Sequence, residues 1–283
     1  MTRPELSDRE HRLFNEWLSE EFGLSFGPAR RDILRARLEP RRVALGFDTF
    51  EQLYLHLKFH PDRKVEQTRL LPHLTNNESY FFRESAQLDE LRHVVLPTVK
   101  AVLEQAGGQE IRLLSGGCAA GEEAYTLAII VRQSGLIRPP WSVQVTGMDL
   151  DPDALGRARA AQYGPNAFRR VEDDLRSRYF DASGPMAWTV KPAIRSTVRF
   201  ASANLVSPGW WRSLPPQDVA FCRNVLIYFD DQSVARAIDG LYQSLRPGGF
   251  LFLGHAESLS RVPTRFVPVR KPGVIYYQRP LDG

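Results

Sequence analysis

The chain has 283 residues, of which 43% are hydrophobic and 25% are charged, so it can bury one large core and a smaller one. No apolar run approaches the roughly 18 residues of a membrane span, and the charged opening segment differs from a secretory signal. Cys118 and Cys222 lie far apart, outside any metal-ligand spacing. We therefore expect a cytoplasmic protein with reduced cysteines, no membrane insertion and no bound metal.

Most of the positive charge is concentrated in one segment. The net charge of the chain is +4, and residues 30–42 alone hold six arginines against two acidic residues. Arg31 and Arg35 are one helical turn apart, while Leu34 and Leu38 share a face that can point to a core. The pattern predicts a basic helix face that docks on an acidic partner, with a solvated charged face as the alternative.

Hydrophobic periodicity divides the chain into two parts. Residues 1–75 have apolar side chains at helical spacing and no strand pattern, which predicts a small all-helical domain. In residues 76–283, short apolar runs alternate with helical segments, which predicts an α/β domain with a parallel sheet covered by helices. Residues 162–200 break this alternation and are interpreted as an insertion, and residues 246–249 are interpreted as a turn. The predicted strands are residues 111–114, 143–148, 178–180, 188–190, 219–222 and 250–253. The predicted helices are residues 88–103, 122–133, 152–161 and 232–245. Residues 266–278 predict a hairpin.

The first strand of the α/β part leads into a loop of small residues and then a helix that starts with Glu122 and Glu123. Such a loop lets a ligand touch backbone, but it lacks Gly-x-Gly-x-x-Gly spacing, and the two glutamates would repel a pyrophosphate. The ammonium of an adenosyl ligand with an amino acid head would instead be attracted to Glu122. S-adenosylmethionine fits that description. The alternative is that both glutamates only complement the helix dipole.

Polar residues follow two further predicted strands. Asp149 ends the second strand, where a carboxylate can accept hydrogen bonds from ribose hydroxyls. Asp151 precedes Pro152 and is typical of a helix cap, but it stays an alternative for the ribose. Arg223 and Asn224 follow the strand at residues 219–222, so Asn224 either binds cofactor or turns the chain.

Four separated segments together resemble the chemotaxis receptor glutamate methyltransferase family. They are residues 75–84 (TNNESYFFRE), 116–125 (GGCAAGEEAY), 222–230 (CRNVLIYFD) and 254–258 (GHAES). The resemblance covers almost the whole chain and implies a helical N-terminal domain, a Rossmann-like methyltransferase sheet and a small β-subdomain inserted near residues 162–200. The sequence departs from the family pattern at Ala124, Gly147, Met148 and Ala256.

The resemblance also implies S-adenosylmethionine as cofactor, S-adenosylhomocysteine as product, and no metal. It implies that Arg83 and Tyr228 position the substrate, although Arg83 as an ion-pair residue and Tyr228 as a core residue are alternatives. A substrate glutamate has a pKa of about 4.3 and is already ionised at neutral pH, so no general base is expected. The implied cofactor contacts are Asn77, Ser79, Arg83, Gly117, Glu122, Asp149, Asn204, Leu205, Arg223 and Asn224.

The implied partner is the acidic methylation region of a receptor's cytoplasmic helices, with Arg31 and Arg35 as docking residues on a monomeric enzyme. A nucleic-acid methyltransferase is one alternative, but Asn224 is followed by Val225-Leu226, where amino-methylating enzymes usually have two prolines and an aromatic residue. A non-catalytic scaffold that binds S-adenosylmethionine is the other. Residues 181–187 look like a shortened loop, which predicts that the enzyme does not need the receptor's C-terminal tail.

Overall fold

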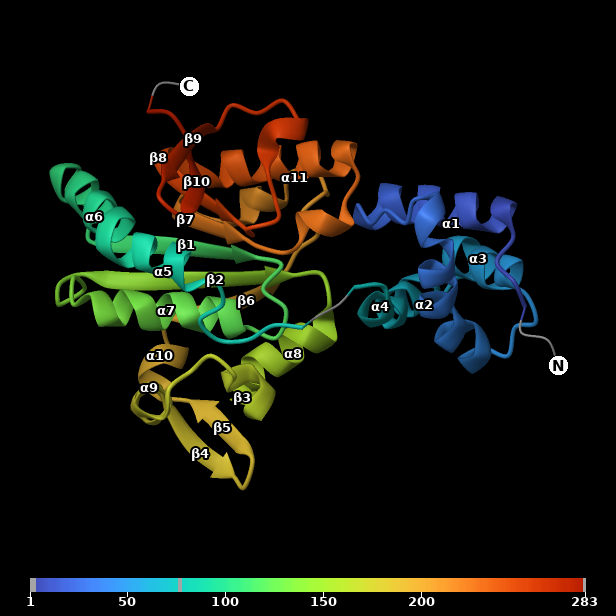
Figure 1. Cartoon of the computed structure of the whole chain (residues 1–283), viewed down its shortest axis with the longest axis horizontal. Coiled ribbons are helices and arrows are strands. Elements are labelled where there is room, and N and C mark those ends of the chain that lie inside the picture. Colours follow the sequence, from blue (N-terminus) through green and yellow to red (C-terminus); the bar gives the residue numbers. More distant parts are fainter. Residues whose placement is uncertain (1–3, 76–77, 282–283) are drawn as a thin grey trace. The chain divides into compact units, whose positions relative to one another are not determined.

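The computed structural model describes residues 4–75 and 78–281 and divides into two compact units (Figure 1). The smaller unit comprises Met1–Asn77 together with Leu226–Val234, and the larger unit comprises Glu78–Val225 and Ala235–Gly283. The short segment 226–234 therefore belongs to the smaller unit although it follows a strand of the larger one. No hydrophobic pattern in the sequence predicts this excursion.

The smaller unit is built from helices with clear start signals. Ser7 and Thr49 each form a capping box, so two helices begin with their first N–H groups satisfied. Leu34 and Leu38 are fully buried, which is what their spacing predicts. The elements are α1 (Asp8–Phe22), η1 (Pro28–Arg30), α2 (Arg31–Ala44), α3 (Phe50–Phe59), α4 (Arg63–Leu74), η5 (Leu226–Tyr228) and the first turn of α11 (Asp231–Ser244).

Backbone pairing attaches the segment 226–234 to the helices of the smaller unit. Leu24 forms an isolated antiparallel bridge with Phe229, and the Ser25 N–H donates to the Tyr228 carbonyl oxygen at 2.8 Å. The Ser19 hydroxyl also donates to the Asp230 carboxylate. The tyrosine of the third family segment is thus held by the smaller unit through its backbone.

The larger unit contains a seven-stranded sheet with the order β6-β2-β1-β7-β8-β10-β9. The first five strands in this order run parallel, and β10 and β9 are antiparallel to their neighbours. Its strands are β1 (Glu110–Gly116), β2 (Ser142–Asp149), β6 (Val198–Ser202), β7 (Gln217–Cys222), β8 (Leu245–Leu253), β9 (Val267–Lys271) and β10 (Val274–Gln278).

Helices cover the parallel strands, as their alternation with strands predicts. α6 packs on β1, α7 packs on β1 and β2, and α8 packs on β2 and β6. Leu113, Leu127, Val145 and Phe221 are fully buried in the resulting core. The helices are α5 (Ser85–Glu90), the π-helical turn η2 (Leu91–Val95), α6 (Leu96–Gln105), α7 (Glu122–Ser134), α8 (Pro152–Ala160), the short η4 (Trp210–Ser213) and η6 (Leu259–Arg261), and the rest of α11.

A second, three-stranded sheet has the order β3-β5-β4 and lies between α8 and β6 in the chain. Its elements are β3 (Gln162–Tyr163), η3 (Pro165–Phe168), α9 (Asp173–Tyr179), β4 (Phe180–Gly184), β5 (Ala187–Val190) and α10 (Pro192–Arg195). The helical N-terminal part, the Rossmann-like sheet and the inserted β-subdomain thus confirm the predicted fold class.

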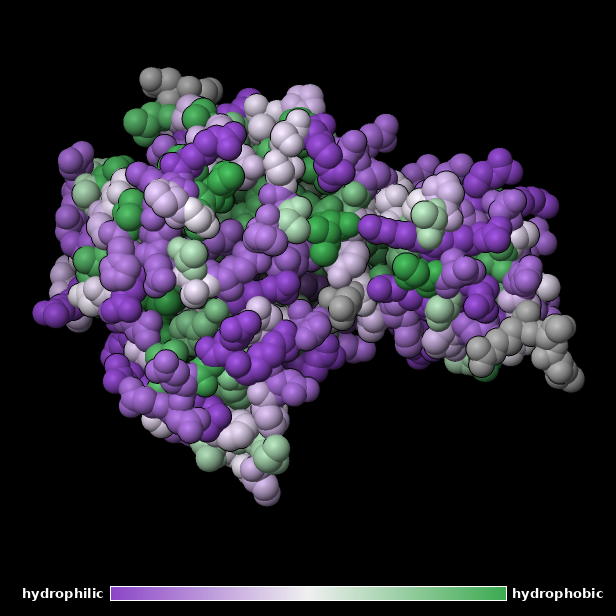
Figure 2. Space-filling model, viewed as in Figure 1, coloured by the Kyte–Doolittle hydropathy of each residue, from purple (hydrophilic) through white to green (hydrophobic). Residues whose placement is uncertain are grey.

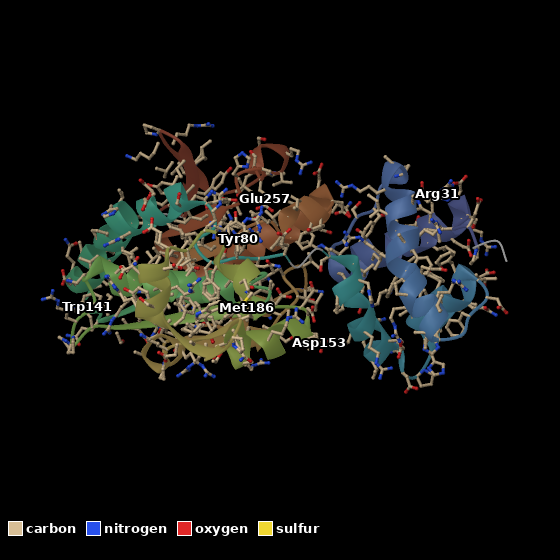
Figure 3. All side chains as sticks on the ribbon, turned by 60° about the horizontal axis from the view of Figure 1, so that its bottom comes forward. Arg31, Tyr80, Trp141, Asp153, Met186 and Glu257 are labelled. Atoms are coloured by element: carbon tan, nitrogen blue, oxygen red, sulfur yellow. The ribbon has the colours of Figure 1, made fainter. Side chains whose placement is uncertain are left out.

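Three local predictions were wrong. Arg178 and Tyr179 end a helix, and only Phe180 starts a strand. The predicted turn at residues 246–249 lies inside β8, where the pairing register with β7 shifts. Residues 181–187 form most of a tight hairpin whose outer strand, β4, is an edge strand, with Met186 at its turn (Figure 3). An edge strand is thus present beside this turn, and independence from the receptor tail stays a prediction.

The surface is mostly hydrophilic on the face drawn in Figure 2, where hydrophobic residues gather in separated patches. Within the described residues, no helix is both long and apolar enough to cross a membrane. Phe59 in the smaller unit and Met186 in the larger unit are among the exposed apolar side chains.

Candidate active site

The carboxyl ends of three neighbouring strands define the candidate site. β1 ends at Gly116, β2 at Asp149 and β7 at Cys222, and β1 lies between the other two. From β1 the chain proceeds to β2 and β6 on one side and later to β7 and β8 on the other. Ligands of open α/β sheets bind at such a reversal of strand order, outside the carboxyl ends of the strands.

The loop after β1 is fixed by hydrogen bonds to the neighbouring strand. The N–H groups of Gly117 and Cys118 donate to the Met148 carbonyl oxygen at 2.7 and 3.0 Å. Gly117 has a φ of +73°, and a Cβ at this position would overlap the Cγ2 methyl of Val225. Only glycine therefore lets the loop lie against the segment that follows β7, which brings two of the four family segments together.

Gly147, one of the departures from the family pattern, has a packing reason. A Cβ at this position would lie 2.6 Å from the Phe200 ring and 3.0 Å from the Cys118 sulfur. The missing side chain makes room for Phe200 beside the cofactor loop. The departure therefore affects packing behind the loop and leaves the Asp149 carboxylate in place.

Glu122 has a buried carboxylate with an unused oxygen. The residue is 6% exposed, and its Oε2 atom has no hydrogen-bond partner among the described residues. Burial raises the pKa of Glu122, while a hydrogen bond from Ser79 and the charge of Arg157 act in the opposite direction. An unsatisfied buried carboxylate oxygen at the start of α7 fits the ammonium group of S-adenosylmethionine.

Asp149 and Asp151 have different surroundings. Asp149 Oδ2 accepts from the Ala119 N–H at 2.8 Å and Oδ1 from the Asp151 N–H at 2.9 Å, and burial raises its pKa. A carboxylate offers about four lone-pair sites, so Asp149 can still accept from ribose hydroxyls. Asp151 caps α8 through bonds from Asp153 and Ala154 and is 4% exposed. The geometry favours Asp149 for the ribose.

Arg83 lies in a short loop with an unusual backbone. Its neighbours Phe82 and Glu84 have φ values of +58° and +57°. The Arg83 guanidinium lies 5.5 Å from the Tyr80 ring centroid, and that of Arg169 lies 3.8 Å from the same centroid. Figure 3 labels Tyr80 in the larger unit. Arg83 forms no ion pair within the described residues, and its role in positioning the substrate stays a prediction.

Aromatic packing anchors the segment just before Arg83. Phe81 is fully buried and stacks on Phe168 at a centroid distance of 5.2 Å, with Tyr163 and Phe180 edge-on at 4.8 Å. The Phe81 N–H also donates to the Ala167 carbonyl oxygen at 2.9 Å. The inserted β-subdomain thereby supports the loop that carries Arg83.

Asn224 turns the chain after β7. It has a φ of +61°, and its N–H donates to Glu257 Oε2 at 2.8 Å. The same Glu257 oxygen accepts from the Gly254 N–H at 2.7 Å. Glu257 is not among the residues predicted from the sequence. Its place in the family segment 254–258 is the feature that could have indicated its role.

The remaining predicted residues lie in three places. The Asn204 side chain accepts from the Val206 N–H at 3.1 Å, and Leu205 is buried against Gly116 at the end of β1. Tyr228 is partly buried and belongs to the smaller unit. Asn77 is outside the described residues. Within those residues, no group of three or more His, Cys, Asp or Glu side chains could hold a metal ion.

The predicted basic face is partly neutralised within the smaller unit. Arg31 pairs with Asp8, and further ion pairs join Arg41 to Glu66 and Arg42 to Glu39. Arg35 forms no ion pair with any residue that the structure describes. Of the two docking candidates, only Arg31 thus has an ion-pair partner in the part of the chain that the structure describes.

The fold and the site define a methyltransferase built to bind S-adenosylmethionine. A family model described as the SAM binding domain of CheR methyltransferase matches residues 77–275, and one described as its all-alpha domain matches residues 9–75. This chain belongs to the CheR methyltransferase family, as its four motif segments predict.

Relatives with established names cover nearly the full chain. Chemotaxis protein methyltransferase 1 of Pseudomonas aeruginosa is 32% identical over 95% of this chain and 98% of that protein. Chemotaxis protein methyltransferase 2 of Vibrio cholerae is 30% identical over 98% of this chain and 95% of that protein. The probable biofilm formation methyltransferase WspC of Pseudomonas putida is 34% identical over 88% of this chain and 56% of that protein.

Proposed function

We propose that this protein transfers a methyl group from S-adenosylmethionine to glutamate side chains on the cytoplasmic helices of a chemoreceptor. The products are a glutamate methyl ester and S-adenosylhomocysteine. The observation that carries the proposal is the buried Glu122 carboxylate with its unused oxygen, beside a glycine loop at the strand reversal. Family membership and the names of the chemotaxis relatives support the receptor as substrate.

Each cofactor group has a candidate partner in the larger unit. Glu122 and Ser79 would bind the amino acid head, and Asp149 would bind the ribose hydroxyls. The backbone of Gly117 would lie against the ligand, because glycine leaves it uncovered. The set that the family motifs imply is completed by Asn77, Arg83, Asn204, Leu205, Arg223 and Asn224.

For this reaction the protein mainly has to align the substrate carboxylate with the methyl group of the cofactor. The bound cofactor supplies an electrophilic methyl group on a sulfonium. The substrate glutamate is already ionised, so no side chain has to remove a proton. Arg83 would hold the substrate carboxylate in line with the methyl group, and Tyr228 is the second positioning candidate. Alignment and partial removal of water contribute most, because the opposite charges of the reactants diminish together.

A labelling experiment tests this function. The protein is incubated with methyl-labelled S-adenosylmethionine and either receptor cytoplasmic fragments, duplex DNA or structured RNA. We expect label in the receptor fragments, released as methanol by base because it is held as an ester. Label in nucleic acid, or base-stable label in protein, would contradict the proposal, and cofactor binding without any transfer would identify a scaffold.

A further inference from the structure

Arg223 is one of the most completely buried charged side chains of the larger unit. Its side chain is 2% exposed, and its Nε atom donates to Glu123 Oε2 at 2.7 Å. Its Nη1 atom donates to the carbonyl oxygen of Arg83 at 2.7 Å. These bonds engage the Nε and Nη1 atoms of the guanidinium with protein atoms.

The Arg83 carbonyl lies at a strained point of the chain. Phe82 and Glu84, on either side, both have left-handed backbone conformations that non-glycine residues rarely adopt. The Phe82 N–H donates to Thr126 Oγ1 in α7 at 3.2 Å. Glu84 Oε2 is buried without a hydrogen bond among the described residues, and Arg223 Nη1 lies 3.9 Å from it. Arg223 thus compensates a charge and satisfies a carbonyl in the same strained turn.

Arg223 is itself fixed to the frame of the sheet. Its partner Glu123 accepts a second hydrogen bond from Ser115 Oγ, at 2.6 Å, near the end of β1. Gln87 Oε1 lies 3.4 Å from Arg223 Nη1, and Gln87 Nε2 donates to the Leu253 carbonyl oxygen at 2.7 Å, at the end of β8. The contacts connect the carboxyl ends of β1, β7 and β8 to one carbonyl group, that of Arg83.

We propose that Arg223 is a positioning residue that acts through Arg83. Arg223 binds the Arg83 carbonyl oxygen and offsets the charge of Glu84. It thereby fixes the left-handed turn and so sets where the Arg83 side chain points. This inference rests on the role proposed for Arg83 in methyl transfer.

The variant that tests this role must avoid leaving an unpaired buried charge. Removing Arg223 alone would leave the Glu123 carboxylate buried without its ion-pair partner, so the test uses the neutral pair Arg223→Gln with Glu123→Gln. The control neutralises Arg246 and Asp218, an ion pair at the starts of β8 and β7 whose aspartate is buried and whose arginine is partly exposed, through Arg246→Gln with Asp218→Asn. Single-turnover transfer from saturating labelled cofactor to receptor fragment is measured for both.

We expect the Arg223 pair variant to lose transfer rate by about 100-fold, since small misplacements of a positioning group have effects of this size. Transfer is measured at saturating cofactor, so the loss of rate does not depend on weaker cofactor binding, and the control should keep its transfer rate. Amide hydrogen exchange at residues 82–84 should accelerate in the variant, while exchange in the second half of α7 stays unchanged. Unchanged exchange at residues 82–84 would overturn the inference.

The decisive comparison repeats the paired substitution in an Arg83→Ala background. If Arg223 acts through Arg83, the substitution should cost no further transfer rate there. An equal loss in both backgrounds would show a merely structural role and overturn the inference. Full transfer by Arg83→Ala alone would instead refute the proposed role of Arg83, so the two failures are distinguishable.

Discussion

Glu122 and Glu123 are adjacent in the sequence, yet their carboxylates have different surroundings. Glu123 accepts hydrogen bonds from Arg223 and Ser115, so its charge is compensated inside the protein. Glu122 keeps an oxygen without a partner among the described residues. If both glutamates only complemented the helix dipole, their surroundings would not need to differ. A bound ammonium group would offset the cost of burying the Glu122 charge.

The raised pKa of Glu122 predicts how cofactor affinity depends on pH. Only the ionised carboxylate attracts an ammonium group, so affinity should be full above the raised pKa and fall as the pH drops through it. Because burial moves this pKa upward, the loss should begin above the ordinary range of a glutamate. Calorimetry with S-adenosylhomocysteine between about pH 5 and 8 measures this.

The matched variant is Glu122→Gln, which keeps the shape and removes the titration. We expect it to bind at least about 10-fold more weakly at neutral pH and to lose the pH dependence of affinity. A variant that binds as tightly as wild type, with the same pH profile, would remove Glu122 from the site.

At the scale of elements, the β1–α7 loop depends on a single glycine. Gly117→Ala places a methyl group against Val225 in a left-handed conformation, so we expect unfolding free energy to fall by about 2–4 kcal/mol. Gly107→Ala is the control, because Gly107 has a φ of +72° but open space around it, and it should lose only about 1–2 kcal/mol. Urea denaturation compares the two.

Adding Val225→Ala to the Gly117→Ala variant removes the overlap but keeps the backbone strain. The double variant should recover part of the unfolding free energy that Gly117→Ala loses. Its remaining loss should then equal that of the Gly107→Ala control. Equal losses for Gly117→Ala and Gly107→Ala would mean that the loop does not depend on contact with Val225.

Asp218, at the start of β7, makes the sheet sensitive to pH. Burial raises its pKa to about 6 from 3.8, although it accepts from the Arg112 N–H and pairs with Arg246. The folded state therefore binds a proton more readily, so the contribution of this group to stability is full below pH 3.8 and is lost as pH rises through about 6.

Asp218→Asn removes this titration while keeping an acceptor for Arg112. The stability of the variant relative to wild type should therefore rise between about pH 4 and 7, by about 3 kcal/mol. Urea denaturation at a series of pH values provides the difference. A flat difference would show that Asp218 does not titrate in this range.

Particular residues show what the sequence can and cannot predict. Strand and helix alternation and the four family segments predict the architecture, because both are local patterns. The contact of Arg223 with Glu123 joins residues 100 positions apart, and no spacing rule predicts it. The wrong strand at Arg178-Tyr179 arose because a short segment with aromatic residues is compatible both with a strand and with the end of a helix.

At the scale of the whole molecule, the basic helix α2 is the proposed receptor contact. Reversing Arg31 and Arg35 to glutamate should raise the Michaelis constant for receptor by about 10-fold at low salt, because like charges then meet the acidic partner. The effect should shrink at high salt, and cofactor affinity should stay unchanged. Steady-state kinetics at several salt concentrations measure this.

The control for that reversal is the same change of charge elsewhere on the smaller unit, at Arg63 and Lys64 of α4. Those reversals should leave the Michaelis constant for receptor near the wild-type value. If both pairs of reversals raise it equally, the net charge of the unit matters and α2 is not a specific docking face.

The most direct test of the account separates cofactor binding from methyl transfer. Cofactor affinity and single-turnover transfer to receptor glutamates under saturating S-adenosylmethionine are measured for wild type, Glu122→Gln and Arg83→Ala. Glu122→Gln should bind cofactor weakly but transfer at a near-normal rate once saturated. Arg83→Ala should melt like wild type but, under saturating cofactor, transfer at least about 100-fold more slowly. The reverse pattern, or normal transfer by Arg83→Ala, would contradict the account.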